Sequence, residues 1–346
     1  MTTMTAAVLQ YHGDRDAVKL ISVPLPQPKP GEVRIKVEAC ALNWLDVGIR
    51  RGPKFGAIPL PLITGSDIAG VIDAVGDQVE GWAAGDAVLV YPLITCSVCE
   101  LCRSGSLTVC PDHKIIGEHI NGGLAEYVTV PAANLIRKPD SLSFEAVAAL
   151  PVVGMTAWHM LITLGQLRVG ETVLIPGAGG GVASISVQIA RHAGAHILAT
   201  TSSPEKMQKA HDLGAEVVVD YRDPTWTAQI LDATAQRGVD MVQNNVGAST
   251  WADSLAVLAR NGRLVVCGSH AGTNFDLSIP QIYHRQLRII GANGGTYPGL
   301  VTVLKLAESG VVQPVVDTVL PLSEIHEGHR LLEERDHFGK VVIRIA

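Results

Sequence analysis

The sequence predicts an α/β protein in which a barrel-like β-unit is followed by a doubly wound parallel sheet. Residues 172–175 form a short apolar run, a glycine cluster follows at 177–181, and residues 184–191 carry apolar side chains at helical spacing. Before this stretch, short apolar runs alternate with Gly- and Pro-rich turns, a pattern typical of barrel-like β-structure. The 346 residues are enough for two domains.

Composition narrows the class of protein. Hydrophobic residues make up 47% and charged residues 17%, so the chain can bury a large core. The net charge is −6 and there is no basic run, which argues against nucleic acid or an anionic membrane as a partner. The start of the chain lacks a signal-peptide pattern, and we expect a cytoplasmic protein. Residues 146–165 are uncharged, but Pro151, Gly154 and His159 interrupt them, so we expect buried core segments rather than a membrane span.

The first 90 residues are predicted to be mainly strands. Residues 6–9 are apolar, and residues 33–37 alternate apolar and basic side chains with period two. Four prolines between 24 and 30 require an extended connection. Residues 62–72 and 87–90 are further apolar runs, separated by glycine-marked turns.

Four cysteines predict a structural metal site. Their spacing is C-x2-C-x2-C-x7-C, and four thiolates on one loop can close a tetrahedral shell around one zinc ion with no open position; they are Cys96, Cys99, Cys102 and Cys110. Free thiols or two disulfides are the simpler alternatives. An iron–sulfur cluster is a third alternative to the zinc site, although the seven residues before the last cysteine do not match a ferredoxin spacing. Cys40 and Cys267 lie in apolar contexts and are interpreted as core residues.

The glycine-rich turn predicts a dinucleotide site. Its glycines allow the backbone to approach a pyrophosphate, and the following helix offers free N–H groups; the candidate residues are Gly179, Gly180, Gly181 and Val182. Further strands of the same sheet are predicted at 195–200, 217–220, 239–242, 263–268 and 287–291. A helix is expected at 300–312 and a last strand of the first domain at 340–345.

Taken together, the motifs resemble one family. They are Asn43-x-x-Asp46, residues 65–70, the four-cysteine lobe, residues 123–128, the turn at 178–183, and the ending 338–342. In this order they are similar to the medium-chain dehydrogenase/reductase superfamily, which includes zinc alcohol dehydrogenases and quinone oxidoreductases. The resemblance implies a GroES-like β-barrel catalytic domain at 1–150, completed by 315–346, and a Rossmann domain at 151–314. It also implies a homodimer or homotetramer, in which the edge strand at 287–291 pairs with its copy.

One feature departs from the zinc alcohol dehydrogenases. The positions that resemble their catalytic zinc ligands are Asn43, Ser66-Asp67 and Val152, and Asn, Ser and Val are poor zinc ligands. The chain therefore resembles a member with one structural zinc and without the catalytic one. His119, His159 and His284 could supply a different metal site, but we interpret them as hydrogen-bonded core or pocket residues.

Without a metal to polarise a carbonyl, reduction of an activated alkene is the chemistry we expect. Hydride goes to the β-carbon, and the enolate then needs hydrogen-bond donors and a proton. The resemblance places Asn43 and Thr156 near the nicotinamide: Asn43 could donate from its amide, and Thr156 could hold the carboxamide. The alternatives are a turn residue for Asn43 and, for Thr156, a helix residue bonded to its own backbone.

The residues after the second strand of the cofactor domain favour NADP(H). An NAD enzyme usually has a carboxylate here, whereas this chain has Thr201, Ser202, Ser203 and then Lys206, which suit a 2′-phosphate. Glu205 is the residue that could counter this preference. Tyr221 resembles a tyrosine that contacts the same phosphate in quinone reductases, or is simply a half-buried residue at a strand end. Turns at Asn244 and Gly268 lie where family cofactors touch the strand ends.

The substrate is expected to be a small apolar molecule, because no anionic anchor is evident and several apolar residues could line a cleft: Trp44, Ile49, Leu93, Ile94 and Tyr283. An enone or quinone reductase is the leading hypothesis. An alcohol dehydrogenase or carbonyl reductase of the same fold is the first alternative, and a cofactor-binding, non-enzymatic member is the second.

Overall fold

The computed structural model describes residues 2–52 and 57–345 and divides into two compact units. Unit 1 contains residues 1–152 and 314–346, and unit 2 contains residues 153–313. Each unit has its own β-structure and its own hydrophobic core. None of the helices in the described residues is both long and apolar enough to cross a membrane.

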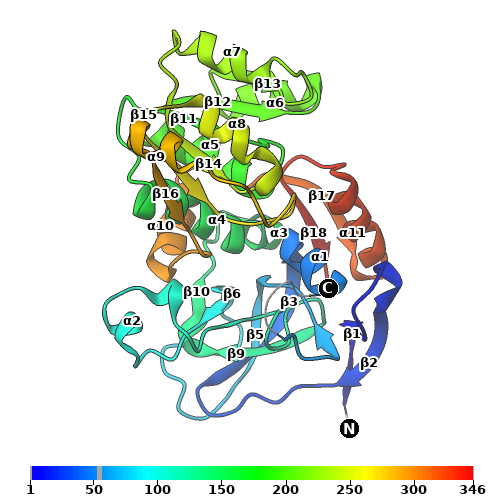
Figure 1. The fold of residues 1–346 in the computed structure, drawn as a ribbon. Helices are drawn as coiled ribbons and strands as arrows, with labels where there is room; N and C mark the ends of the chain where they lie inside the picture. Colours follow the sequence, from blue (N-terminus) through cyan, green and yellow to red (C-terminus); the bar gives the residue numbers. More distant parts are fainter. Residues whose placement is uncertain (1, 53–56, 346) are drawn as a thin grey trace. The chain divides into compact units, whose positions relative to one another are not determined.

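Unit 1 is built on mainly antiparallel sheet, with one parallel pair, β17 and β18 (Figure 1). A three-stranded sheet has the order β2–β1–β4, formed by β1 (Thr3–Leu9), β2 (Val18–Pro24) and β4 (Leu62–Ile63). A seven-stranded sheet has the order β10–β6–β5–β3–β18–β17, with β9 also paired to β3. Its strands are β3 (Glu32–Ala41), β5 (Asp67–Val75), β6 (Ala87–Val90), β9 (Tyr127–Pro131), β10 (Leu135–Arg137), β17 (Val316–Pro321) and β18 (Lys340–Arg344).

The central strand β3 shows why these segments pair. Val33, Ile35 and Val37 are fully buried, while Arg34 and Lys36 between them point the other way. β5 and β9 pair with β3, and so does β18 from the C-terminal part of the chain, so this segment completes the seven-stranded sheet. The apolar stretch 62–72 is not one strand but two, β4 and β5, because Gly65 between them has a positive φ of 98°.

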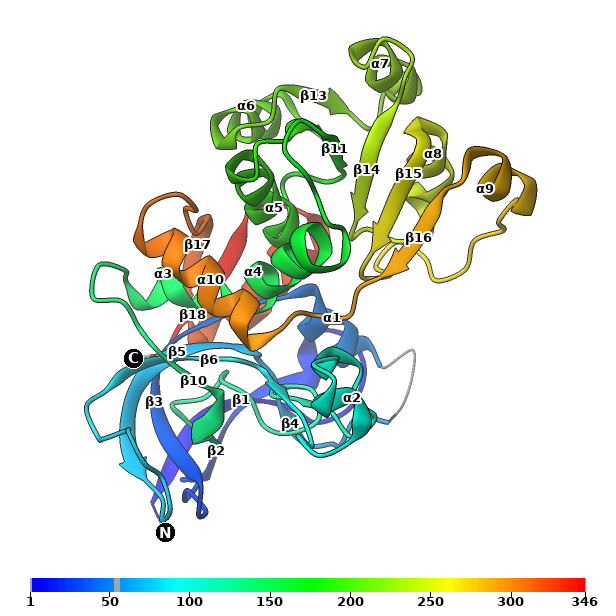
Figure 2. The same ribbon diagram turned by 90° about the vertical axis from the view of Figure 1, so that its left-hand side faces the viewer.

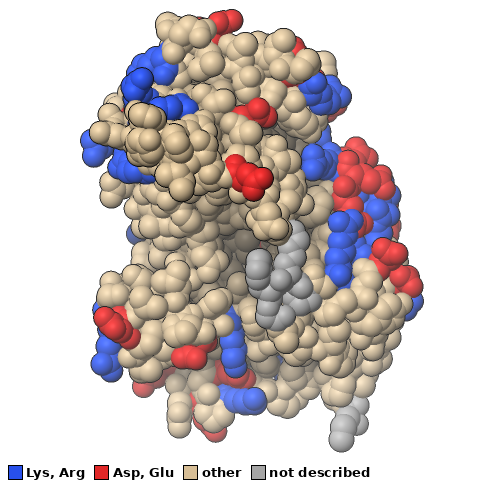
Figure 3. Space-filling model, in the orientation of Figure 1, with Lys and Arg blue, Asp and Glu red and all other residues tan. Residues whose placement is uncertain are grey.

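Short helices and a two-stranded ribbon complete unit 1. The helices are α1 (Trp44–Arg51), α2 (Glu100–Arg103), α3 (Phe144–Ala148) and α11 (Ile325–Glu334); the ribbon is formed by β7 (Leu93–Ile94) and β8 (Lys114–Ile115). Helix α11 buries Ile325, Leu331 and Leu332 in the core and exposes a charged face. On that face Arg330 forms ion pairs with Glu327 and Glu334, and acidic and basic side chains alternate along the right side of Figure 3.

Unit 2 contains a six-stranded parallel sheet in the order β13–β12–β11–β14–β15–β16, the strand order of a Rossmann fold. The strands are β11 (Thr172–Ile175), β12 (His196–Thr201), β13 (Val217–Asp220), β14 (Val239–Asn244), β15 (Leu258–Val266) and β16 (Arg288–Gly291). β14, β15 and β16 lie side by side in Figure 2. The near-continuous burial of β11, β12 and β14 is the pattern expected of strands covered on both faces, whereas β16 at the end of the sheet is only partly buried.

Helices connect these strands. They are α5 (Gly181–His192), α6 (Pro204–Leu213), α7 (Trp226–Ala233), α8 (Trp251–Val257), α9 (Ile279–Arg285) and α10 (Tyr297–Glu308). Helix α4 (Pro151–Trp158), continued by a π-helical stretch at His159–Leu164, begins at the boundary of the units. The uncharged stretch at 146–165 is therefore helical and largely buried. The predicted α/β class is confirmed, with a unit of mainly antiparallel sheet followed by a Rossmann sheet.

Candidate active site and metal lobe

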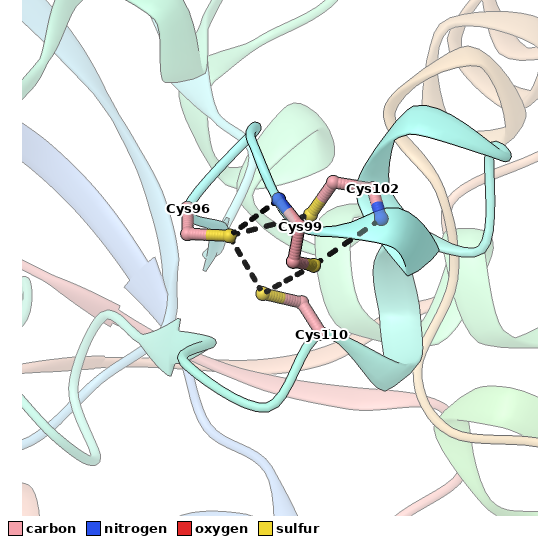
Figure 4. A group of neighbouring side chains, drawn as sticks. All are labelled: Cys96, Cys99, Cys102 and Cys110. Atoms are coloured by element: carbon pink, nitrogen blue, oxygen red, sulfur yellow. Dashed lines mark hydrogen bonds between the residues drawn. The ribbon is translucent and has the colours of Figure 1, made fainter.

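The four predicted cysteines converge in space (Figure 4). Their sulfur atoms lie within 4.8 Å of one another, and the contacts Cys96–Cys110, Cys96–Cys102 and Cys99–Cys110 measure 3.6, 3.9 and 3.9 Å. Four sulfurs about 2.3 Å from a tetrahedral zinc ion would be about 3.8 Å apart. The donor set and its spacing therefore fit one closed zinc site, in which Cys99 caps the start of helix α2 and Cys102 lies within that helix.

The backbone around the cysteines favours thiolates. The N–H groups of Cys99 and Cys102 donate to the sulfurs of Cys96 and Cys99, at 3.3 and 3.4 Å. Hydrogen bonds from the N–H groups of Val98 and Cys99 lower the pKa of Cys96 to about 7. Burial raises the pKa of Cys102 to about 12, and the positive charge of a bound cation would favour its thiolate.

Asn43 lies between β3 and α1, where it begins the helix. Its backbone N–H donates to Asp46 Oδ2 at 2.8 Å, and the other oxygen of Asp46 accepts from the Gly65 N–H at 2.9 Å. Asp46 is completely buried, and this burial raises its pKa to about 6. Both of its oxygens hold backbone groups, so Asp46 fixes the loop on which Asn43 lies.

The carboxamide of Asn43 is part of a buried polar network. Its Nδ2 donates to Asp67 Oδ2 at 2.9 Å, and its Oδ1 accepts from Lys340 Nζ at 2.6 Å. Lys340 also donates to Asp67 Oδ2, at 2.8 Å. The remaining oxygen of Asp67 accepts from the Val152 N–H, in the first turn of α4, at 2.7 Å. The side chain of Asp67 is 0% exposed and that of Lys340 4%, so their charges neutralise one another away from water.

Residues of this network stand at the positions that resemble the catalytic zinc ligands of the alcohol dehydrogenases. Asn43 and Asp67 bind each other and Lys340, Val152 contributes only its backbone N–H, and the buried Ser66 hydroxyl has no partner within the described residues. The residues present do not fit a catalytic zinc, because Asn, Ser and Val offer no good ligand atom. In residues 2–52 and 57–345, the four cysteines are the single group of three or more His, Cys, Asp or Glu side chains close enough to hold a metal.

The three histidines considered as metal ligands, His119, His159 and His284, lie apart from the cysteine cluster and from one another in the sequence. His119 Nδ1 accepts from the Ile115 N–H at 3.1 Å, and its ring is 6.0 Å from the ring of His113. His159 is buried, which lowers its pKa. His284 is exposed and packs beside Tyr283. None of them is in a metal-binding cluster among the described residues. Thr156, the second predicted catalytic residue, lies on α4 in unit 2 and is 4% exposed.

The strand, glycine turn and helix predicted for the dinucleotide are present in unit 2. β11 ends at Ile175, Gly177 has a positive φ of 72°, and α5 begins at Gly181. The turn is tied to the next strand: the Gly177 N–H donates to Thr200 Oγ1 and the Ala178 N–H to the Thr200 carbonyl, at 3.2 and 2.8 Å. Gly179, Gly180, Gly181 and Val182 thus occupy the turn and the first residues of the helix, where free N–H groups can bind phosphate.

The predicted 2′-phosphate residues lie near the end of β12. Ser203 begins α6, and its hydroxyl accepts from the Lys206 N–H at 3.2 Å. The Tyr221 N–H, just after β13, donates to the Thr201 carbonyl at 3.1 Å, so Tyr221 lies beside this strand end. Glu205 is 77% exposed and pairs with Lys209 at 2.9 Å along the helix.

Asn244 and Gly268 form turns at the ends of β14 and β15. Asn244 Oδ1 accepts from the N–H groups of Val246 and Gly247, and its Nδ2 donates to Thr250 and Ser254, so this side chain shapes the turn. Gly268 has a positive φ of 86°. The parallel pairing puts these turns and the glycine turn after β11 at the carboxyl edge of one sheet.

Sequence reasoning missed the role of Lys340 and its pairing with Asp67. Lys340 was part of the family ending 338–342, but nothing local indicated its partners, which are 273 and 297 residues away in sequence. A signal was available, since a lysine that begins an apolar strand, before Val341 and Val342, must find a partner if it is buried.

Two family models match most of the chain. The alcohol dehydrogenase GroES-like domain matches residues 29–140, and the zinc-binding dehydrogenase domain matches residues 181–309. A zinc-type alcohol dehydrogenase-like protein of Schizosaccharomyces pombe is 34% identical, over 95% of this chain and 96% of its own. An acryloyl-coenzyme A reductase of Metallosphaera sedula is 30% identical, over 98% and 99%. A solved structure named NAD-dependent alcohol dehydrogenase is 41% identical with a TM-score of 0.95, over 99% of this chain and 100% of that chain.

Proposed function

Because this chain belongs to the medium-chain dehydrogenase/reductase superfamily, we propose that it is an NADP(H)-dependent oxidoreductase that reduces an activated C=C bond, as in an enone or quinone, without a catalytic metal. The observation that carries the proposal is the network of Asn43, Asp67 and Lys340 at the positions that resemble the catalytic zinc ligands. A donor set of Asn, Ser and Val does not suit a Lewis acid, and conjugate reduction is the family chemistry that needs none.

The bound cofactor supplies a hydride. When the hydride reaches the β-carbon of an enone, negative charge develops on the carbonyl oxygen and is stabilised by hydrogen-bond donors. One side-chain N–H of Asn43 donates to Asp67, and within the described residues the other makes a single long contact of 3.5 Å, with the Ala41 carbonyl. This second N–H is the donor that we assign to the substrate oxygen. We also assign Thr156 to the cofactor, as the residue that holds the carboxamide of the nicotinamide.

The proposed preference for NADPH comes from the end of β12. Residues 200–204 contain hydroxyls and no carboxylate, Lys206 follows, and Tyr221 lies beside the same strand end. Glu205, which could oppose a phosphate, pairs with Lys209 instead. The solved relative named NAD-dependent indicates that the family also contains proteins that use NAD, so the cofactor has to be measured directly.

We expect a small apolar substrate, since Trp44, Leu45 and Ile94 are partly buried apolar side chains against the core of unit 1. We expect a homodimer or homotetramer in the cytoplasm, with β16 as the pairing edge, because β16 is the last strand of its sheet and, within the described residues, pairs with β15 on one side alone.

The test is to supply NADPH with 2-cyclohexenone, with 1,4-benzoquinone and, separately, with cyclohexanone. We expect reduction of an unsaturated probe with a kcat/KM at least tenfold above that for the ketone. A ketone reduced as fast or faster would instead support the alternative, a carbonyl reductase or alcohol dehydrogenase, which the names of the S. pombe relative and the solved relative favour. Binding of NADPH with no turnover of any probe would point to a non-enzymatic member.

A further inference from the structure

We propose that Lys340 and Asp67 are positioning residues that hold the Asn43 carboxamide in a single orientation, and that Lys340 also makes this amide a stronger hydrogen-bond donor. The inference rests on the proposed function, in which Asn43 contacts the substrate oxygen.

Three neighbouring strands bring the network together. β5, β3 and β18 are adjacent in one sheet, and the pairs Ala41–Asp67 and Ala41–Val342 lie in register. Asp67 is the first residue of β5 and Lys340 the first of β18, while Asn43 follows the end of β3. Because β3 runs antiparallel to both neighbours, all three side chains lie at the same edge of the sheet.

The chemistry of the two neighbours fixes which way the amide faces. An ammonium can only donate, and a carboxylate can only accept. Lys340 Nζ therefore requires the oxygen of Asn43, at 2.6 Å, and Asp67 Oδ2 requires its nitrogen, at 2.9 Å. Turning the amide over would bring its N–H group against an ammonium and its oxygen against a carboxylate, so only one orientation is compatible with the network.

Burial strengthens the effect. Asn43 is 7% exposed, so water cannot replace either contact. The ammonium on the amide oxygen withdraws electron density from the nitrogen, and the second N–H becomes a better donor toward developing negative charge. Asp67 is fixed in turn by the Val152 N–H at 2.7 Å and by Lys340 at 2.8 Å, so it cannot rotate away.

The test compares Lys340→Met and Lys340→Arg in the full-length, zinc-loaded protein, with NADPH and 2-cyclohexenone or 1,4-benzoquinone. Lys340→Met should lower kcat at least tenfold, with KM and the Kd for NADPH changed less than threefold, and Lys340→Arg should recover part of the rate. Arg344→Met is the matched control. Arg344 lies on β18 like Lys340, but its ion pair is with Glu145, which is outside the network of Asn43, Asp67 and Lys340. An equal loss of kcat in Arg344→Met would overturn the proposal.

Variants that combine two changes separate positioning from folding. Lys340→Met leaves Asp67 buried without its cation and could unfold the protein, so the neutral pair Asp67→Asn/Lys340→Met is a second route that leaves no isolated charge. Because Lys340 acts through Asn43, Asn43→Ala/Lys340→Met should be no slower than Asn43→Ala alone. If the losses of kcat in the two single variants multiply in the double variant, Lys340 acts independently of Asn43, and the proposal is contradicted.

A spectroscopic measurement tests the inference even if neither probe is reduced. In protein labelled with ¹⁵N-asparagine, the side-chain NH2 signals of Asn43 are identified by their loss in Asn43→Ala. We expect them to shift and broaden in Lys340→Met and to stay unchanged in Arg344→Met. Absent turnover would then count against the proposed function alone, and an unchanged Asn43 signal against the positioning role.

Discussion

Lys206 is a single residue on which the proposed cofactor choice depends. It lies in the first turn of α6, three residues after Ser203, where a 2′-phosphate of nearly two negative charges would sit in the proposed site. Charge-assisted hydrogen bonds contribute on the order of 1.5–3 kcal/mol. Lys206→Ala should therefore raise the KM for NADPH by about 10- to 100-fold and leave NADH kinetics nearly unchanged. Steady-state kinetics with both cofactors check this, and equal use of NADH and NADPH by the unmodified protein would defeat it.

His329 is a residue whose burial has a cost at low pH. It is 1% exposed on α11, and neither ring nitrogen has a hydrogen-bond partner in the described structure. Burial first, and then the nearby Arg50, lower its pKa to about 4. The other charged or titratable groups that act on it are Glu333, His326 and Arg15.

The lowered pKa gives His329 a defined effect on stability. Because the folded state binds this proton only below about pH 4 and the unfolded state already near pH 6.5, stability is present above pH 6.5 and is lost as pH falls toward 4. His329→Leu should reduce the loss of unfolding free energy between pH 8 and pH 5 by about 2 kcal/mol. Urea titrations at both pH values measure it, with the exposed His192→Leu as control. An unchanged pH dependence in His329→Leu would show that His329 is not responsible.

At the scale of elements, Gly70 shows how closely the strands of unit 1 approach. A Cβ at Gly70, inside β5, would lie 2.2 Å from the Lys36 carbonyl oxygen on β3. Gly70→Ala should cost roughly 1–3 kcal/mol of stability, or more if β3 cannot shift. Gly48→Ala is the control, because that exposed helical position has no atom within 4 Å of the added carbon and should gain up to about 1 kcal/mol. Chemical denaturation of both variants should therefore give changes of opposite sign.

The cysteine lobe is a second element with a separable role. Metal analysis should find one zinc per chain, and two would overturn the loss of the catalytic site. Cys99→Ser removes one of four ligands, so we expect zinc loss and faster proteolysis between residues 96 and 110, while turnover measured before unfolding is retained. Retained stability together with lost turnover would contradict a structural role for this zinc.

At the scale of the whole molecule, two units with separate cores should respond separately. The glycine turn belongs to unit 2 and the cysteine lobe to unit 1. A ligand at a hundred times its Kd stabilises the folded state by about 2.7 kcal/mol. NADPH should thus raise the thermal midpoint of the unmodified protein and, by a similar amount, of Cys99→Ser. A variant that no longer responds to NADPH would mean that the lobe and the cofactor site are coupled.

Patterns carried by neighbouring residues were enough to predict much of this protein. The six strands of unit 2 were found because buried parallel strands are nearly continuous apolar runs, and the glycine turn because its strand, turn and helix follow one another directly. The four cysteines gather within one short loop, so their spacing alone indicated the metal lobe.

Contacts between distant segments were decided only by the tertiary structure. Asn43 meets Lys340 across 297 residues because β18 returns from the end of the chain to lie against β3. The physical reason is that a buried charge is stable only beside its partner, and no local pattern in the sequence states which partner the fold will bring to it.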